Sequence, residues 1–187
     1  MDLELTNRQF EKVIQMCRTL FEKKLHDYGS AWRILRPSSV TDQIFIKANR
    51  IRTLQYKESK IDEGIVPEFI AIINYSIIGL IQLDLGYSDT ADLSVVDAMA
   101  KYDCFANKSL SLMIDKNHDY DEAWRSMRVS SYVDLILMKI YRTKQIESLD
   151  GQTLVSEGVD ANYMDMMNYA AFGLIKLVLE NQSNETE

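Results

Sequence analysis

The sequence has few of the residues that turn or break a chain. It contains only seven glycines and two prolines among 187 residues. A many-stranded β architecture needs frequent turns, so this scarcity argues against one and favours long helices with few connections. With 47 % hydrophobic and 26 % charged residues, the composition is that of a soluble globular protein with a substantial core. We therefore predict an all-α fold.

Several kinds of functional site are also missing. The two cysteines, Cys17 and Cys104, lack metal-type spacing, and two histidines are too few for a zinc site of the usual kind. A Gly-rich phosphate loop, a nucleophile elbow and a Cys-His arrangement are all absent from the sequence, which disfavours covalent catalysis. The net charge of −7 argues against a nucleic-acid surface, because backbone binding needs a positive excess along one face. A small anion held by a few local cations remains compatible with this charge.

Signals for export or membrane insertion are weak. The N-terminus has neither the basic region nor the apolar stretch of a secretory signal, so we expect a cytoplasmic protein. The longest apolar run, Phe69 to Leu85, is interrupted by Asn74, Tyr75 and Gln82 and falls short of the ~20 residues that span a bilayer. It predicts a buried helix, and we expect no membrane partner.

Three segments of the first half have helical patterns. The first begins at Thr6 and Gln9, which form a capping-box pattern. The second is amphipathic and covers about residues 41–54. The third covers residues 66–85 and ends before Gly86. Its isoleucines could suggest a strand, but its length and its lack of period-two alternation favour a helix.

The second half repeats the first. With a constant offset of 92, residues 26–50 match residues 118–142 at thirteen of twenty-five positions, among them every histidine and every tryptophan. Beyond a two-residue insertion the offset is 94, and the third segments match too. We divide the chain into repeats at 1–85 and 86–187, with a connection at about 86–95. We expect them to pack about a pseudo-two-fold axis into one helical bundle, either as a monomeric pseudo-dimer or within a homodimer.

Matched polar residues of the third segments form a candidate metal site. Glu63 precedes Asn74 by eleven residues, and at ~3.6 residues per turn this spacing returns to nearly the same helix face. Glu157 and Asn168 repeat the pattern. Alternatively, the two asparagines are buried polar residues that neighbouring helices satisfy.

The second copy adds a further acid. Asp165 lies three residues before Asn168, so carboxylate and amide oxygens could converge there with Glu157. This is the hard-oxygen donor set that Mg²⁺ prefers. The first copy has Ala71 at the equivalent position, so we expect the copies to differ in metal binding.

The second segments carry matched cations. Lys47 and Arg50, like Lys139 and Arg142, lie three residues apart and project together, which suits phosphate oxygens. The alternative is a solvated helix face.

A motif of the form His-Asp-Tyr-x-x-Ala-Trp-Arg-x-x-Arg occurs once in each copy. Its aromatic residues and arginines beside a carboxylate suit stacking on a planar base with phosphate contacts. The aromatic residues are Tyr28, Trp32, Tyr120 and Trp124. The alternative is a structural corner in which the tryptophans anchor the core.

Both copies resemble a known family, the nucleotide modification associated domain of bacterial and phage proteins. The resemblance rests in the first copy on Lys24, Asp27-Tyr28-Gly29, Trp32, Lys47, Arg50, Glu63 and Asn74-Tyr75. In the second copy it rests on Lys116, Asp119-Tyr120, Trp124, Lys139, Arg142, Glu157, Asp165 and Asn168-Tyr169, with Asp121 in place of the glycine.

That family is distantly similar to the all-α MazG-type nucleoside triphosphate pyrophosphohydrolases. Their helices supply paired acidic motifs to magnesium, and their units associate into bundles. The resemblance implies a MazG-like bundle built within one chain. The MazG pattern has Glu-x-x-Glu on its earlier helix, whereas this chain has Lys47 and Arg50 in that region.

Together these patterns predict a magnesium-dependent protein that binds a nucleotide-like triphosphate and could cleave it to a monophosphate and pyrophosphate. Glu157, Asp165 and Asn168 would hold the metal that activates water, with the two acids as the catalytic pair. The cations of the second segment would neutralise phosphate, and Tyr120 or Trp124 would stack on the base. The alternative is a non-catalytic nucleotide-binding or scaffold protein. In the leading hypothesis the first copy would be weaker or merely structural, and the second copy the more competent one.

Overall fold

The structure, a computed structural model, describes residues 3–57, 64–152 and 157–180. Its long helices are α1 (Leu3–Tyr28), α2 (Pro37–Leu54), α3 (Val66–Leu85), α4 (Val95–Tyr120), α5 (Val129–Ser148) and α6 (Val159–Leu174). Three short elements complete it: the 3₁₀ helices η1 (Ala31–Ile34) and η2 (Ala123–Ser126), and the π-helix η3 (Ile175–Glu180). The described residues contain no strand, so the all-α prediction is confirmed.

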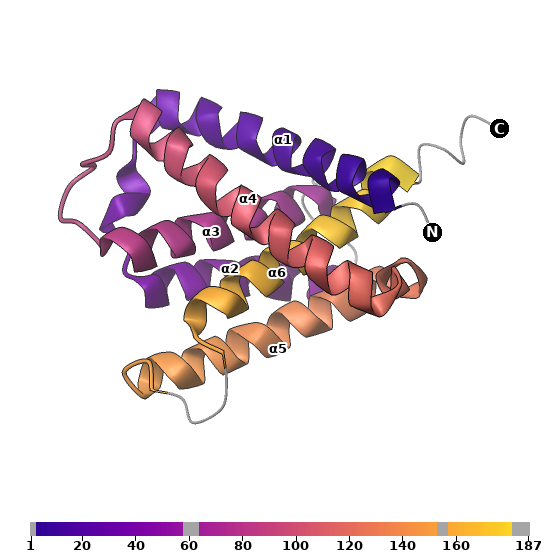
Figure 1. The fold of residues 1–187 in the computed structure, drawn as a ribbon. Coiled ribbons are helices and arrows are strands. Elements are labelled where there is room, and N and C mark those ends of the chain that lie inside the picture. Colours follow the sequence, from indigo (N-terminus) through magenta and orange to yellow (C-terminus); the bar gives the residue numbers. More distant parts are fainter. Residues whose placement is uncertain (1–2, 58–63, 153–156, 181–187) are drawn as a thin grey trace.

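The helices repeat in the order that the duplication predicts. The series α1, η1, α2 and α3 recurs as α4, η2, α5 and α6, and α1 and α4 begin at positions 92 residues apart. Helices α1 and α4 lie side by side along one face, while α3 and α6 contact each other in the middle of the bundle (Figure 1). Helix α2 packs on α3, and α5 packs on α6. The two units therefore form the expected pseudo-two-fold bundle.

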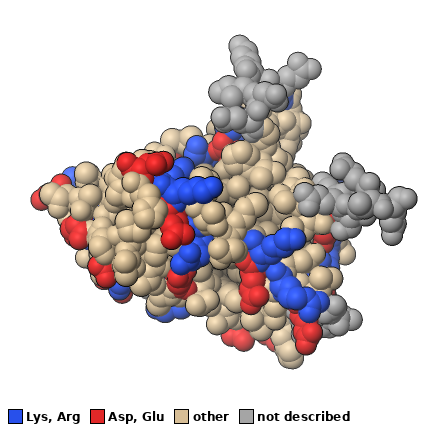
Figure 2. Space-filling view, turned by 90° about the horizontal axis from the view of Figure 1, so that it is seen from above, with Lys and Arg blue, Asp and Glu red and all other residues tan. Residues whose placement is uncertain are grey.

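The outer face formed by α1 and α4 carries both signs of charge. Seen from above, lysines and arginines lie next to aspartates and glutamates (Figure 2). Arg18 and Asp103 join the two helices there, with Nε to Oδ1 at 2.7 Å and Nη2 to Oδ2 at 2.9 Å. This bidentate pair fixes α1 against α4.

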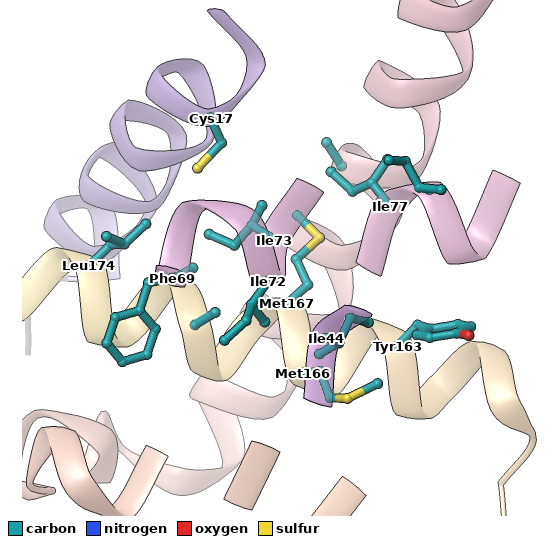
Figure 3. Packing of buried hydrophobic residues seen from close by; sticks show 14 of the residues in the cluster. Cys17, Ile44, Phe69, Ile72, Ile73, Ile77, Tyr163, Met166, Met167 and Leu174 are labelled. Atoms are coloured by element: carbon teal, nitrogen blue, oxygen red, sulfur yellow. The ribbon is translucent and has the colours of Figure 1, made fainter. Parts of the chain in front are cut away.

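Helix α3 forms the centre of the core. Phe69, Ile72, Ile73 and Ile77 are fully buried on it, among residues from α1, α2 and α6 (Figure 3). It is the one described helix that is long and apolar enough to cross a membrane, but 67 % of its most apolar stretch is buried inside the protein. The predicted buried helix is thus found as a core helix.

Matched glycines let α3 and α6 approach closely. A Cβ atom on Gly79 would lie 2.7 Å from the ring of Tyr163, and one on Gly173 would lie 2.9 Å from the ring of Phe69. Because position 69 is equivalent to position 163, the same contact is made twice across the pseudo-two-fold axis. The identity of these glycines in both copies therefore has a packing reason.

We predict that Gly79→Ala destabilises the protein by about 1–2 kcal/mol, because the ring of Tyr163 must move to admit the methyl group. Alanine is otherwise the better helix former by up to about 1 kcal/mol, so the sign of the change reports the contact. Urea unfolding measures the effect. Gly64→Ala is the control, because nothing lies within 4 Å of a Cβ atom there. An unchanged or increased free energy of unfolding for Gly79→Ala would contradict the prediction.

Two expectations about helix starts are wrong. Helix α1 already includes Leu3, so Thr6 lies inside it. The Thr6 side chain is fully buried and donates a hydrogen bond to Glu122 of the second copy instead of capping. Helix α2 begins at Pro37, where proline suits the first turn. Asp42 consequently lies inside α2, where it pairs with Lys144 of α5 at 2.6 Å.

Candidate functional site

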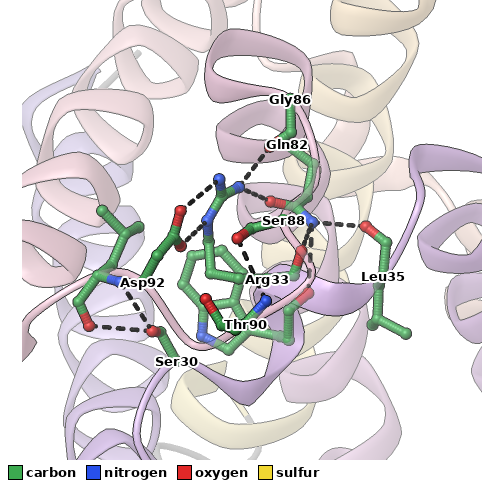
Figure 4. A network of polar contacts seen from close by, with 10 residues as sticks. Ser30, Arg33, Leu35, Gln82, Gly86, Ser88, Thr90 and Asp92 are labelled. Carbon is green, nitrogen blue, oxygen red and sulfur yellow. Dashed lines mark hydrogen bonds and ion pairs between the residues drawn. The ribbon is translucent and has the colours of Figure 1, made fainter.

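The corner after α1 is held by a buried arginine. Arg33 in η1 is 3 % exposed, and its guanidinium donates to the side-chain oxygen of Gln82, to the Gly86 carbonyl at 2.5 Å and to Asp92 Oδ1 at 2.8 Å (Figure 4). Gln82 in turn donates to the carbonyl groups of Arg33 and Leu35. The arginine and the end of α3 thereby fix the loop that connects the two copies.

The second copy builds the same corner with different residues. Arg125 donates to Glu180 at 2.7 Å and to Gln9 at 2.9 Å, which ties α1 and η3 to η2. Lys176 is equivalent to Gln82, and its ammonium donates to the carbonyl groups of Arg125 and Met127 at 2.8 and 2.6 Å. Arg33 and Arg125 therefore act as the structural-corner interpretation of the motif predicts.

Each copy encloses a pocket between its first and third helices. The first pocket has a volume of about 480 Å³ and the second of about 260 Å³. Their linings correspond at most positions of the duplication, although Lys47, Pro67 and Glu68 line the first pocket and their equivalents do not line the second. Among the matched pairs are Lys24/Lys116, Tyr28/Tyr120, Trp32/Trp124, Ala71/Asp165, Asn74/Asn168 and Tyr75/Tyr169. The structure thus brings most of the predicted site residues together, once in each copy.

Asp165 is neutralised inside the second pocket. Its side chain is 5 % exposed, and its Oδ1 and Oδ2 atoms lie 2.6 Å from the ammonium groups of Lys116 and Lys139. Burial disfavours the charged form of Lys116, but the hydrogen bond and charge of Asp165, with the charge of Glu157, outweigh it and raise the pKa of Lys116. Both carboxylate oxygens are therefore already bonded to cations.

The first pocket places its carboxylate one helical turn earlier. Ala71 stands where the second copy has Asp165, and the buried acid is Glu68, which forms an ion pair with Arg50 and lies 3.4 Å from Lys47 Nζ. Lys24 also lines this pocket, and its Nζ has no hydrogen bond or ion pair within the part of the chain that the structure describes. Sequence reasoning missed Glu68 in this role, although its three-residue offset from Ala71 could have indicated it.

The two asparagines make equivalent bonds with one difference. Asn74 donates to the Cys17 carbonyl, and Asn168 donates to the Ser109 carbonyl, each at 3.2 Å. The carbonyl oxygen of Asn74 accepts a hydrogen bond from Tyr102 at 2.9 Å. The position equivalent to Tyr102 is Phe10, which has no hydroxyl group, and the buried side-chain oxygen of Asn168 has no hydrogen-bond partner among the described residues.

The tryptophans are core residues at the inner wall of each pocket. Trp32 is 9 % exposed and Trp124 is 6 % exposed, and the buried indole N–H groups of both have no hydrogen-bond partner in the part of the chain that the structure describes. The ring of Trp124 stacks on Phe172 at 4.4 Å, and the guanidinium of Arg125 lies over it at 4.4 Å. Its faces are therefore occupied, so base stacking by Trp124 would require these neighbours to move.

The tyrosines are the accessible aromatic residues. Tyr28 is 56 % exposed and Tyr120 is 72 % exposed, and each lines its pocket from the end of α1 or α4. They are positioned to cover a planar ligand without disturbing the core. Of the aromatic residues predicted to stack, the tyrosines fit that role in this geometry.

The remaining predicted acids do not complete a metal site in the described part of the chain. Glu157 is exposed and precedes the start of α6, so the helical spacing assumed between it and Asn168 is wrong. Glu63 lies outside the described residues. Among the residues that are described, no group of three or more His, Cys, Asp or Glu side chains could hold a metal ion.

The arrangement at Asp165 does not fit a magnesium ion. Two ammonium groups already bind its oxygens, and a divalent cation would have to displace them against their positive charge. Asn168 offers one buried oxygen without a partner, which alone is not a ligand set.

Of the second copy's cation pair, only one member is bonded. Lys139 is buried against Asp165. Arg142 is half-buried, and no carboxylate pairs with it among the described residues. It does not line the second pocket.

Comparison with known proteins identifies two copies of one family domain. The family model described as Nucleotide modification associated domain 1 matches residues 24–83 and 116–177. No curated protein and no solved structure matches the chain. The similarity to MazG-type enzymes that the sequence suggested stays a prediction. Both matched ranges include the pocket lysine, the tyrosine, the tryptophan and the asparagine of their copy.

Proposed function

Because the chain belongs to the nucleotide modification associated domain 1 family, we propose that it binds a small nucleotide-like ligand in its two equivalent pockets. The observation that carries this proposal is the recurrence of one pocket chemistry in both copies. Each pocket combines an accessible tyrosine, a lysine and an asparagine with an apolar wall. Apolar pockets with a few convergent polar groups are the usual form of small-molecule sites.

Buried polar atoms without partners support the proposal. Three such atoms, Nε1 of Trp32, Nε1 of Trp124 and Oδ1 of Asn168, have no hydrogen-bond partner among the described residues and belong to residues that line a pocket. An unsatisfied buried donor or acceptor costs about 1–3 kcal/mol, so such atoms are rare unless a ligand or water meets them. A nucleobase, which carries both donors and acceptors on its edges, has the chemistry to satisfy them.

A phosphorylated ligand is supported by the cations of the first pocket. Lys24 and Lys47 both line it. The first pocket has a volume of about 480 Å³, which lies in the usual range for small-ligand sites, roughly 300–1,000 Å³. Magnesium dependence and pyrophosphate release stay predictions, as do the catalytic roles of Glu157 and Asp165. The experiments below measure the effect of Mg²⁺ and the release of pyrophosphate separately from ligand binding.

We expect nucleosides or nucleotides to raise the melting temperature of the protein, measured with and without Mg²⁺. Calorimetric titration of the best ligand then compares Tyr28→Ala and Tyr120→Ala with Tyr141→Ala. Tyr141 is 68 % exposed on α5 but lines neither pocket, so it is the matched control. Loss of base stacking is expected to weaken binding about tenfold at the affected pocket, while Tyr141→Ala binds normally.

Two outcomes would count against this function, and a third bears only on catalysis. No stabilisation by any member of a broad panel, with or without Mg²⁺, would reject binding and favour the scaffold alternative. Equal losses in all three tyrosine variants would place the ligand outside the pockets. Pyrophosphate release at the same rate in wild type and in Asp165→Asn would exclude catalysis at that residue without touching the binding claim.

A further inference from the structure

We propose that the first pocket contains a phosphate-binding subsite between Lys24 and Lys47, at the place that the Asp165 carboxylate fills in the second pocket. The inference rests on the proposed function, and it specifies which pocket receives the charged part of the ligand. It reverses the expectation from the sequence that the second copy is the more competent one.

The second pocket shows what this position binds. The carboxylate of Asp165 lies 2.6 Å from Lys116 Nζ on α4 and 2.6 Å from Lys139 Nζ on α5. It is almost fully buried, so the two ammonium groups hold an anion away from solvent. Two lysines from separate helices thus form a built anion site, which the chain satisfies with its own side chain.

The first pocket keeps the two lysines but has no carboxylate at the position equivalent to Asp165. Lys24 and Lys47 are the equivalents of Lys116 and Lys139, and both line the pocket. Ala71 replaces the aspartate, which removes the side chain that would fill the space between them. The first pocket is also the larger of the two, with about 480 Å³ against about 260 Å³.

The acid of the first copy does not take over this position. Glu68 forms ion pairs with both Arg50 and Lys47, the second at 3.4 Å, while Lys24 has no partner among the described residues. In the second copy the residue equivalent to Glu68 is Asn162, and the cation left without an acid is Arg142, which lies outside the pocket lining. Each copy therefore has one spare cation, but only that of the first copy lines its pocket.

The expected ligand group is a phosphate or another compact anion attached to a planar ring system. Tyr28 lies at the mouth of the same pocket, where it can cover the ring, and Asn74 lines its wall. In the second pocket the equivalent space is filled, so an uncharged nucleoside suits it better than a nucleotide. Binding of a nucleoside monophosphate is therefore expected to depend on the first pocket.

The test introduces the internal anion into the first pocket. Ala71→Asp is expected to weaken binding of a nucleoside monophosphate tenfold or more, because the new carboxylate competes for both lysines and repels phosphate (on the order of 1.4 kcal/mol per tenfold). Binding of the matching nucleoside should change far less. Ala71→Asn is the matched control, because it adds the same volume without charge. The double variant Glu68→Asn/Ala71→Asp has the residues of the second pocket at both positions. It replaces the single variant in this test if Ala71→Asp folds poorly.

The reciprocal variant provides a readout that needs no nucleotide. Asp165→Ala opens the second site, so inorganic phosphate should raise its melting temperature more than it raises that of Asp115→Ala, whose acid is exposed on α4. Chloride at equal ionic strength is the control for general screening.

The outcomes separate the inference from the proposed function. A wild-type protein that binds nucleotides, together with an Ala71→Asp variant that binds the monophosphate equally well, would overturn the phosphate subsite and leave nucleotide binding intact. Equal phosphate effects on Asp165→Ala and Asp115→Ala would also count against the subsite. If phosphate rescues Asp165→Ala but no nucleotide binds wild type, the anion site stands and the nucleotide proposal fails.

Discussion

Replacement of Asp165 by alanine is expected to lower the free energy of unfolding by about 3–5 kcal/mol in phosphate-free buffer. The carboxylate lies between two ammonium groups, and that of Lys139 belongs to a side chain only 8 % exposed. Removing the acid leaves this charge buried without a partner. Lys116 is half-exposed and can turn towards water, so it contributes little to the loss. Chemical denaturation at neutral pH measures the change.

A second substitution distinguishes this cause from a simple packing defect. In Asp165→Ala/Lys139→Met the buried charge is removed together with its partner, so the double variant should recover a large part of the lost stability. Asp115→Ala, which removes an exposed acid from α4, should change stability by less than about 0.5 kcal/mol. If the double variant is less stable than Asp165→Ala, the unpaired lysine is not the source of the loss.

Replacement of Arg33 by alanine is the second large effect, a loss of about 2–3 kcal/mol. Its guanidinium donates to the side-chain oxygen of Gln82 and to the Gly86 carbonyl, and removing it leaves these oxygens without their donor. The loop that carries Asp92 also loses the ion pair between Asp92 and Arg33. Because this loop joins the two copies, we expect thermal unfolding of Arg33→Ala to begin at a lower temperature than that of wild type. Arg36→Ala is the control, since Arg36 is exposed and lies over the Tyr87 ring at 5.8 Å.

The Arg33 effect should depend on pH. The hydrogen bond from Arg33 lowers the pKa of Asp92 below its ordinary value, about 3.9. A carboxyl group with a lower pKa in the folded state stabilises the protein above the unfolded-state pKa and loses that contribution as the pH falls through the folded-state value. The stability difference between wild type and Arg33→Ala is therefore expected to narrow below about pH 4. A difference that stays constant down to pH 2 would show that the ion pair contributes nothing.

The duplication and the helices could be predicted because they depend on local patterns. Apolar spacing, the scarcity of glycine and proline, and the repeat at a constant offset led to the six long helices and their pairing. The matched glycines could be found from the same alignment, but their role could not. Only the crossing of α3 and α6 shows that Gly79 faces an aromatic ring from the other copy.

The candidate site was only partly predictable, because its charges pair between helices. Asp165 and Asn168 do line one pocket, as their spacing suggested. The partners of Asp165 come from α4 and α5, and nothing in the spacing along α6 reveals that two lysines reach the same carboxylate. The corresponding acid of the first copy, Glu68, lies one helical turn earlier on α3. A comparison of equivalent positions finds only Ala71 opposite Asp165 and therefore misses this acid.

The joining of both units in one chain has a consequence for how the pockets can change. In a symmetric homodimer a single codon determines a residue in both subunits, so neither pocket can acquire a feature that the other lacks. Here Tyr102 differs from Phe10, and Asp165 differs from Ala71, at positions that the axis makes equivalent. Each difference alters one pocket while the shared bundle is kept. The covalent link therefore permits a division of labour between two halves that a pair of identical subunits could not evolve.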